Sequence, residues 1–182
     1  MSFRYRPLVA AALLAALFAA PASAETLRGK VIKVADGDTV TIMTDAGKER
    51  IRLLGIDTPE KKQLPWGPRA KAFTEQQVMG KEVRVETDVE PRDRYGRVLG
   101  YVYVGRTFLN LELVRQGYAM LYTSPPNVAH TDELVAAQRE ARQAGRNIWS
   151  PRDGLTETPY EYRHKGKKPP KKIGQEGLPA AQ

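Results

Sequence analysis

Residues 36–60 read DGDTVTIMTDAGKERIRLLGIDTPE, and this stretch decides the fold. Turn-forming residues stand at 36–38 and again at 46–48, where Asp and Gly tolerate the dihedral angles of tight turns. Between them, residues 39–43 alternate polar and apolar side chains, which is typical of a strand with one buried face. Residues 50–56 predict another strand. Because only a short turn separates the two strands, we expect them to be antiparallel neighbours in one sheet.

The flanking segments extend this hairpin into a barrel. Further strands and helices are predicted along the chain: strands over 27–35, 82–86 and 98–104, and helices over 68–79, from Asn110 to near Gly117, and from Thr131 to Gly145. Asn110 is expected to cap its helix. Five strands with a helix between the third and the fourth is the element order of an OB-fold, a partly open barrel. The sequence therefore predicts an α+β fold, a five-stranded OB-fold β-barrel with three helices.

Both ends of the chain differ from this central part. Residues 1–24 combine a basic start, an apolar run and small residues, the layout of a secretory signal peptide cleaved after Ala24. The alternative is an uncleaved membrane anchor, but the apolar run is shorter than the ~20 residues that a spanning helix needs. Residues 151–182 predict a basic, disordered tail, in which residues 165–172 either touch phosphates or only aid solubility. We therefore expect one domain over 25–150.

These features also predict where the protein acts. A cleaved signal peptide predicts export to the periplasm or the medium, with no stable membrane association afterwards. The length of the remaining chain suits a single domain with a tail. We expect that domain to be a monomer.

The composition restricts the chemistry. The chain has a formal net charge of +8 and no cysteine, which excludes disulfides, thiolate metal sites and cysteine nucleophiles. Its two histidines, His130 and His164, stand before a helix and in the tail. A histidine acid–base pair needs both rings around one phosphate, and two histidines alone make no convincing zinc site. Positive charge attracts polyanions such as nucleic acids, although it also aids solubility. Carboxylates and arginines are therefore the candidate functional groups.

Two carboxylates are expected at one end of the sheet. Asp38 opens the strand over 39–43 and Asp57 follows the strand over 50–56, so antiparallel pairing puts both at the same end. Carboxylates brought together repel each other unless a cation lies between them. Ligands that are all oxygen favour Ca²⁺ or Mg²⁺, and Thr58 can add its main-chain carbonyl.

Two arginines accompany these carboxylates. Arg52 lies inside an apolar stretch, where a charge is costly unless it meets an anion. Arg97 stands just before the strand over 98–104. Either one alone is explained as a surface, carboxylate-paired or turn arginine. Together with the carboxylates they indicate a site that cleaves phosphodiesters, because guanidinium forks bind phosphate oxygens in bidentate fashion.

Four motifs, in this order, resemble the staphylococcal nuclease (thermonuclease) family. They are Asp36-Gly37-Asp38-Thr39-Val40, Arg52-Leu53-Leu54-Gly55-Ile56-Asp57-Thr58-Pro59-Glu60, Asp93-Arg94-Tyr95-Gly96-Arg97 and Asn147-Ile148-Trp149-Ser150. The resemblance covers roughly residues 27–150, and all four motifs in register are a strong signal. It implies an OB-fold and a calcium-dependent endonuclease that hydrolyses DNA and RNA to 3′-phosphate products.

The resemblance also implies a role for each site residue. The implied roles are one Ca²⁺ held by Asp38, Asp57 and the Thr58 carbonyl, Arg52 and Arg97 on the scissile phosphate, Glu60 as general base, and Arg94, Tyr95 and Tyr122 around the terminal nucleotide. Two loops depart from the family pattern. The loop over 61–67 is shorter than in the staphylococcal enzyme, and the stretch over 118–126, which contains Tyr122, differs by one residue in length.

Two other classes of function stay open at this point. A non-catalytic OB-domain binds single-stranded nucleic acid, and exposed tyrosines would stack bases in either case. A surface protein stiffened by calcium would use Asp38 and Asp57 but would leave Arg52, Glu60 and Arg97 without a role. The joint presence of these three residues favours the nuclease.

Overall fold

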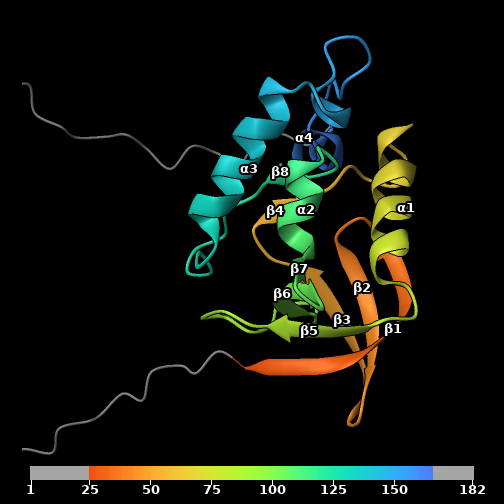
Figure 1. The fold of residues 1–182 in the computed structure, drawn as a ribbon, viewed down its shortest axis with the longest axis vertical. Coiled ribbons are helices and arrows are strands. Elements are labelled where there is room, and N and C mark those ends of the chain that lie inside the picture. Colours follow the sequence, from red (N-terminus) through yellow and green to blue (C-terminus); the bar gives the residue numbers. More distant parts are fainter. Residues whose placement is uncertain (1–24, 166–182) are drawn as a thin grey trace, which may run out of the picture.

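The computed structural model describes residues 25–165 and shows a barrel with helices gathered at one end (Figure 1). The predicted signal peptide over 1–24 and residues 166–182 of the predicted tail lie outside the described residues. In chain order the elements are β1 (Thr26–Asp36), β2 (Thr39–Thr44), β3 (Gly47–Leu53), β4 (Ile56–Asp57), α1 (Trp66–Val78), β5 (Glu82–Glu86), β6 (Val98–Val104), β7 (Thr107–Phe108), α2 (Leu109–Arg115), β8 (Met120–Leu121), α3 (Thr131–Gln143), a 3₁₀ turn over Asn147–Trp149, and α4 (Pro159–His164). No helix in this described part is long and apolar enough to cross a membrane.

Five strands close the barrel. They pair in the order β3-β2-β1-β5-β6, and β7 extends the edge beyond β6. The neighbours in this order are antiparallel. A parallel pairing of β3 with β6 then joins the two ends of the sheet. The predicted α+β class and five-stranded OB-fold barrel are confirmed, with four α-helices among the described residues instead of the three expected.

The β2–β3 hairpin forms as the sequence predicts. The two strands pair along their whole length, and Gly47 begins β3 with φ at +122°, a conformation that L side chains rarely adopt. Val40 and Ile42 on alternate positions of β2 are fully buried, with Ile51 of β3 beside them in the core. Period-two alternation is therefore a sound guide to this wall of the barrel.

The helices seal the barrel with apolar side chains at helical spacing. α1 packs against β1 and α2, and α3 packs against α2. The residues that these two helices bury are Trp66, Gly67, Ala70, Thr74 and Val78 from α1, and Leu134, Ala137 and Ala141 from α3. Spacing of three or four residues gives each helix one apolar stripe, which is why both lie along the core.

The predicted strand over 50–56 is wrong at its carboxyl end. β3 stops at Leu53, and Gly55 turns the chain with φ at +74°. The next two residues form β4, which pairs with β8 in a separate two-stranded sheet. A left-handed residue cannot continue a strand, so the apolar run is interrupted although its composition is uniform. The chain therefore leaves the barrel wall just before Asp57.

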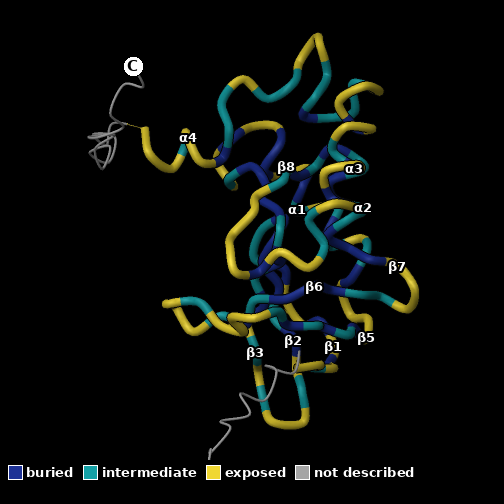
Figure 2. Tube along the Cα trace, turned by 90° about the vertical axis from the view of Figure 1, so that its left-hand side faces the viewer, coloured by how far each residue is buried: buried dark blue, intermediate teal, exposed yellow. Residues whose placement is uncertain are grey.

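The disordered tail predicted from residue 151 is also wrong for the part that the structure describes. Residues 151–165 form a turn and then α4, and Figure 2 shows α4 at the side of the molecule opposite to α2 and α3. The Leu155 amide donates to the Ile148 carbonyl at 2.9 Å, which ties the segment to the 3₁₀ turn. The prediction of disorder rested on the basic run over 165–172, and only residue 165 of that run lies within the described residues.

Asn110 does not cap a helix, contrary to the prediction. α2 begins one residue earlier, and the Asn110 side chain is fully buried inside the first turn. Its Oδ1 accepts from the Val102 amide at 3.0 Å, and its Nδ2 donates to the Leu54 carbonyl at 2.8 Å. One buried amide therefore joins β6, α2 and the turn after β3.

Replacing Asn110 by alanine tests this connection. The Asn110→Ala variant leaves a buried N–H and a buried carbonyl without that partner, so we expect it to lose about 2–4 kcal/mol of unfolding free energy. Urea denaturation followed by circular dichroism measures the loss. Gln76→Ala, on the exposed side of α1, is the matched control and should stay within about 0.5 kcal/mol of wild type. Equal stabilities for the two variants would show that Asn110 does not hold the elements together.

Candidate active site

One cleft of about 770 Å³ collects all nine residues that the sequence predicts for the site. Its walls come from the segment over 52–60, the loop over 90–97 and α4. The predicted residues that line it are Asp38, Arg52, Asp57, Thr58, Glu60, Arg94, Tyr95, Arg97 and Tyr122. Residues far apart in the chain thus face one hollow.

Asp38 is held rigidly at the turn between β1 and β2. Its Oδ2 accepts from the Thr58 amide and the Thr58 hydroxyl, each at 2.9 Å, and its side chain is buried. Gly37 makes this close approach possible, because a Cβ at that position would lie 2.8 Å from the Thr58 side chain and 2.9 Å from Ala70. The Thr74 hydroxyl of α1 donates to the Gly37 carbonyl at 2.6 Å and fixes the turn.

Arg52 lies between the two predicted metal ligands. Its Nη1 is 3.3 Å from Asp38 Oδ2, and its Nη2 is 3.3 Å from Asp57 Oδ1. Nη1 also donates to the main-chain carbonyls of Leu53 at 2.7 Å and Ile56 at 3.0 Å. The turn that ends β3 therefore holds this guanidinium in place, and Asp38 and Asp57 both form ion pairs with it.

Two carboxyl groups of the cleft, Asp36 and Asp57, have raised pKa values. Burial, together with the charge of Asp38, raises the pKa of Asp36 to about 6. Burial also raises the pKa of Asp57, against the lowering that Arg163 and Arg52 cause. Asp36 lines the cleft as well; it opens the first of the four motifs, but no role in the site was predicted for it. Burial thus disfavours the charged forms of Asp36 and Asp57 in spite of the arginines beside them.

A divalent cation fits this donor set. Within residues 25–165 no group of three or more His, Cys, Asp or Glu side chains lies close enough to hold a metal. Asp38 and Asp57 would therefore be the only carboxylate ligands, and the Thr58 carbonyl, water and substrate would have to complete the six to eight oxygens that Ca²⁺ takes. Oxygen donors of this kind suit a hard cation, and its charge would offset the burial of both carboxylates.

Arg97 is positioned by the carboxylate at the start of its own loop. Asp93 Oδ2 accepts from Arg97 Nε at 2.6 Å, while Oδ1 accepts from the amides of Tyr95 at 2.9 Å and Arg97 at 3.0 Å. No hydrogen bond to a described residue uses the two terminal nitrogens of Arg97. These nitrogens remain available to an anion in the cleft.

The predicted nucleotide contacts stand at the outer part of the cleft. Arg94 lies 4.8 Å above the Tyr95 ring and donates to its hydroxyl at 2.7 Å. The Tyr95 side chain is 68% exposed and Tyr122 is 45% exposed. Both rings can therefore stack on a base, which buried tyrosines could not do.

Glu60 is less enclosed than Asp38 and Asp57. Its amide donates to Gln63 Oε1 at 2.8 Å, and Gly67 of α1 packs so closely that a Cβ there would lie 1.9 Å from the Glu60 carbonyl oxygen. Glu60 Oε1 accepts from Arg163 at 2.8 Å, whereas no described residue bonds Oε2. Arg163 lies in the segment predicted as tail, so the sequence did not identify it as a site residue.

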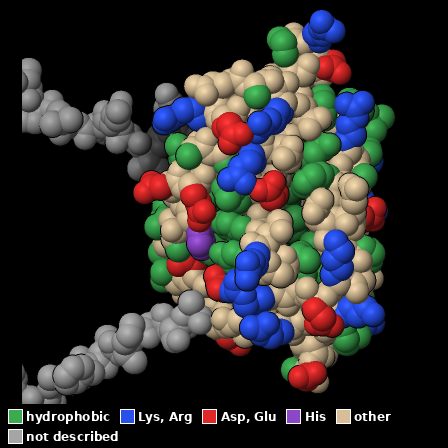
Figure 3. All heavy atoms as spheres, viewed as in Figure 1, with side chains coloured by type: hydrophobic (Ala, Val, Ile, Leu, Met, Phe, Trp, Pro, Cys, Tyr) green, Lys and Arg blue, Asp and Glu red, His purple; other side chains and the backbone are tan. Residues whose placement is uncertain are grey.

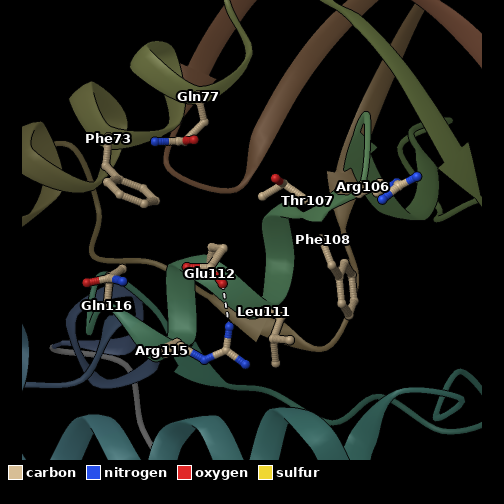
Figure 4. Close-up of a pocket in the computed structure, with 9 residues that line it drawn as sticks. All are labelled: Phe73, Gln77, Arg106, Thr107, Phe108, Leu111, Glu112, Arg115 and Gln116. Atoms are coloured by element: carbon tan, nitrogen blue, oxygen red, sulfur yellow. Dashed lines mark hydrogen bonds and ion pairs between the residues drawn. The ribbon is translucent and has the colours of Figure 1, made fainter.

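A second hollow lies away from these groups. Figure 4 shows it between α1, α2 and the loop before β7, with a volume of about 510 Å³. It contains none of the nine predicted residues, and its Arg115 is paired with Glu112.

On the face shown in Figure 3, basic and acidic side chains are interspersed, with no large patch of one sign. The cleft with the buried carboxylates is therefore the stronger candidate site.

Comparison with known proteins agrees with this geometry. Residues 50–151 match the family model described as "Staphylococcal nuclease homologue". A thermonuclease from Staphylococcus intermedius is 39% identical over 135 residues, which cover 70% of this chain and 80% of that protein. The thermonuclease of Staphylococcus hyicus is 36% identical over 126 residues, 66% of this chain and 75% of that protein. An uncharacterized endonuclease of Escherichia coli is 38% identical over 151 residues, 82% of this chain and 93% of that protein.

The Asp93–Arg97 pair predicts a pH dependence of stability. Burial alone would raise the pKa of Asp93, but hydrogen bonds from Arg97 and Tyr95 hold that pKa below its usual value. A folded-state pKa below the unfolded value of about 3.9 stabilises the protein above that pH, and the contribution is lost as the pH falls through the folded value. We expect Asp93→Asn to lose about 1–2 kcal/mol at pH 7 and progressively less below about pH 4.

Urea denaturation of both proteins at pH 7 and at pH 3 measures this difference. Wild type and variant share all other titrating groups, so general acid destabilisation cancels in the comparison. A loss that stays constant with pH would show that the charge of Asp93 does not stabilise the loop.

Proposed function

Because the chain belongs to the staphylococcal nuclease family, we propose that it is a calcium-dependent endonuclease that hydrolyses phosphodiester bonds of DNA and RNA. The observation that carries this proposal is the convergence of Asp38, Asp57, Arg52 and Arg97 on one cleft. Guanidinium groups and a cation site in one hollow suit a phosphodiester, which bears a negative charge that grows in the transition state. A cleft that only bound nucleic acid would not need carboxylates beside the phosphate.

The two arginines supply fixed positive charge. Arg52 is immobilised by main-chain carbonyls, and Arg97 is immobilised through its Nε. Donors that are positioned in advance cost no reorganisation when charge builds on the phosphate oxygens, and each can be worth about 3–4 kcal/mol in a site that excludes water. In our proposal they bind the non-bridging oxygens of the scissile phosphate.

Glu60 acts as the general base. A water molecule attacks phosphorus in line with the leaving 5′-oxygen, and Glu60 takes its proton, directly or through a second water. The P–O5′ bond breaks and the leaving 5′-oxygen takes a proton from water, so the products carry a 3′-phosphate and a 5′-hydroxyl. The oxygen Oε2, which no described residue bonds, is the one available for this transfer.

Calcium would be held by Asp38, Asp57 and the Thr58 carbonyl. When bound, it supplies Lewis-acid stabilisation of negative charge on the phosphate. Arg94, Tyr95 and Tyr122 bind the nucleotide next to the scissile bond through charge and stacking. Because such contacts address phosphates and ring faces, they carry little base preference.

The remaining parts of the proposal concern the setting of the enzyme. We propose that the protein is exported, by cleavage after Ala24, to the periplasm or the medium, and that it acts as a monomer free of the membrane. The signal layout of residues 1–24 supports export. N-terminal sequencing of protein recovered outside the cytoplasm, with Glu25 as first residue, checks it.

Metal removal tests the proposed activity. Supercoiled plasmid and structured RNA should both be degraded when calcium is present, and the products should carry 3′-phosphate ends. An excess of chelator should abolish cleavage, and added calcium should restore it. Binding without cleavage under both conditions would make the protein a nucleic-acid-binding module instead.

Substitution of Arg97 tests the assignment of the phosphate contact. Arg97→Ala should lower kcat by about 10²–10³ in a protein that still folds, since one preorganised donor to the transition state is lost. Arg106→Ala removes the same charge from an exposed loop outside the cleft and should keep kcat within about twofold. Full activity in Arg97→Ala would remove this residue from the mechanism.

A further inference from the structure

The chain continues past the segment that matches the family, and this continuation reaches the cleft. The family match ends at residue 151, whereas Arg163 and His164 of α4 line the cleft. Two side chains from the first part of the chain hold the connecting segment. Trp66 Nε1 donates to the Asp153 carbonyl at 3.2 Å, and Gln63 Nε2 donates to the Glu157 carbonyl at 2.9 Å. The segment is therefore attached on the same side of the molecule as Glu60.

α4 is fixed at its amino end. The Thr158 hydroxyl accepts from the Glu161 amide at 3.1 Å, and Glu161 Oε2 accepts from the Thr158 amide at 2.8 Å. This reciprocal capping box and the buried Pro159 at the first helical position define where the helix starts. The Arg163 side chain projects from the second turn. The capping box thus positions the backbone that carries Arg163, and the long side chain reaches the segment over 57–60.

Arg163 pairs with the two carboxylates that the proposed reaction needs. Its Nη2 is 2.7 Å from Asp57 Oδ2, and its Nη1 is 3.0 Å from Asp57 Oδ1 and 2.8 Å from Glu60 Oε1. This is a bidentate fork on Asp57 with a further bond to Glu60. The Arg163 side chain is 36% exposed, whereas that of Asp57 is only 5% exposed. The guanidinium thus covers the buried carboxylate from the solvent side.

This pairing cannot persist unchanged when a cation binds. A divalent ion on Asp57 would stand within a few ångströms of the Arg163 guanidinium, and like charges repel each other at that distance in a partly buried site. Arginine stays protonated at any working pH, so it cannot relieve this repulsion by losing its proton. A cation on Asp57 would therefore weaken the Arg163–Asp57 pair and favour transfer of Arg163 to another anion. In the cleft of a nuclease that anion is a phosphate of the substrate.

We propose that Arg163 is a further substrate-binding residue, a third guanidinium that pairs with Asp57 and Glu60 before substrate binds and transfers to a nucleic-acid phosphate when the cation occupies Asp57. This inference rests on the proposed nuclease function and adds a phosphate contact from outside the matched family segment. It has two opposite consequences. Without nucleic acid, Arg163 competes with calcium for Asp57. With nucleic acid bound, Arg163 increases the affinity for the substrate.

The test compares Arg163→Ala and Arg163→Lys with the wild-type chain. Arg152→Ala is the matched control, because it removes the same charge from an exposed position in the same segment that does not line the cleft. Calcium alone is titrated into each protein by isothermal titration calorimetry. Steady-state cleavage of a short single-stranded oligodeoxynucleotide is then measured at saturating calcium and at several salt concentrations.

We expect Arg163→Ala to bind calcium about three- to tenfold more tightly, because a competing cation is gone. We also expect its KM for the oligonucleotide to rise about tenfold, with a smaller change in kcat. The salt dependence of log(1/KM) should lose about one unit of slope, as for the loss of one phosphate contact. Arg163→Lys should fall between wild type and Arg163→Ala, since lysine keeps the charge without the fork. Arg152→Ala should match wild type in all three measurements.

Two results would overturn the inference. If Arg163→Ala binds calcium more tightly but its KM is unchanged or lower, Arg163 only inhibits metal binding. If Arg163→Ala binds calcium more weakly and its KM is higher, Arg163 only supports the fold. Both are read against a wild-type chain that cleaves the oligonucleotide. If the wild type itself does not cleave, the proposed function fails, and that failure is distinct from a failure of Arg163.

Discussion

The site depends on the burial of two carboxylates beside one guanidinium. Asp38 and Asp57 are each 3.3 Å from Arg52, whose position is set by main-chain carbonyls and not by the carboxylates alone. Burying like charges together costs several kcal/mol unless other charges compensate. Such an arrangement would be a poor way to stabilise a fold, but it suits the cation and phosphate site that we propose. The hydrogen bonds around Asp38, Asp57 and Arg52 hold these three side chains in position.

The barrel brings these groups together through strand register. Thr39 stands opposite Arg52 in the β2–β3 ladder, so Asp38 lies next to the residue that must balance it. The Leu53 amide also donates to the Asp38 carbonyl at 2.9 Å. Gly55 turns the chain after β3, so Asp57 also lies next to Arg52. A one-residue slip of this ladder would separate the groups and turn core side chains outward, so the core and the site enforce the same register.

Much of this arrangement could be predicted from local patterns, and the errors share one cause. Alternation found the strands, and antiparallel pairing placed Asp38 and Asp57 at one end. The family resemblance supplied roles for the other residues. The break at Gly55, the burial of Asn110 and the docking of Arg163 were missed. Each of these depends on a partner distant in the sequence, which composition and spacing do not reveal.

The most direct measurement of the central claim is an anomalous difference map from crystals of the chain soaked with terbium, a calcium substitute with a strong anomalous signal. If the buried carboxylates form a cation site, the strongest peak will contact both Asp38 and Asp57. A cleft without a peak, or a strongest peak bound to other carboxylates among the described residues, would contradict the claim that these residues hold a metal for phosphodiester cleavage.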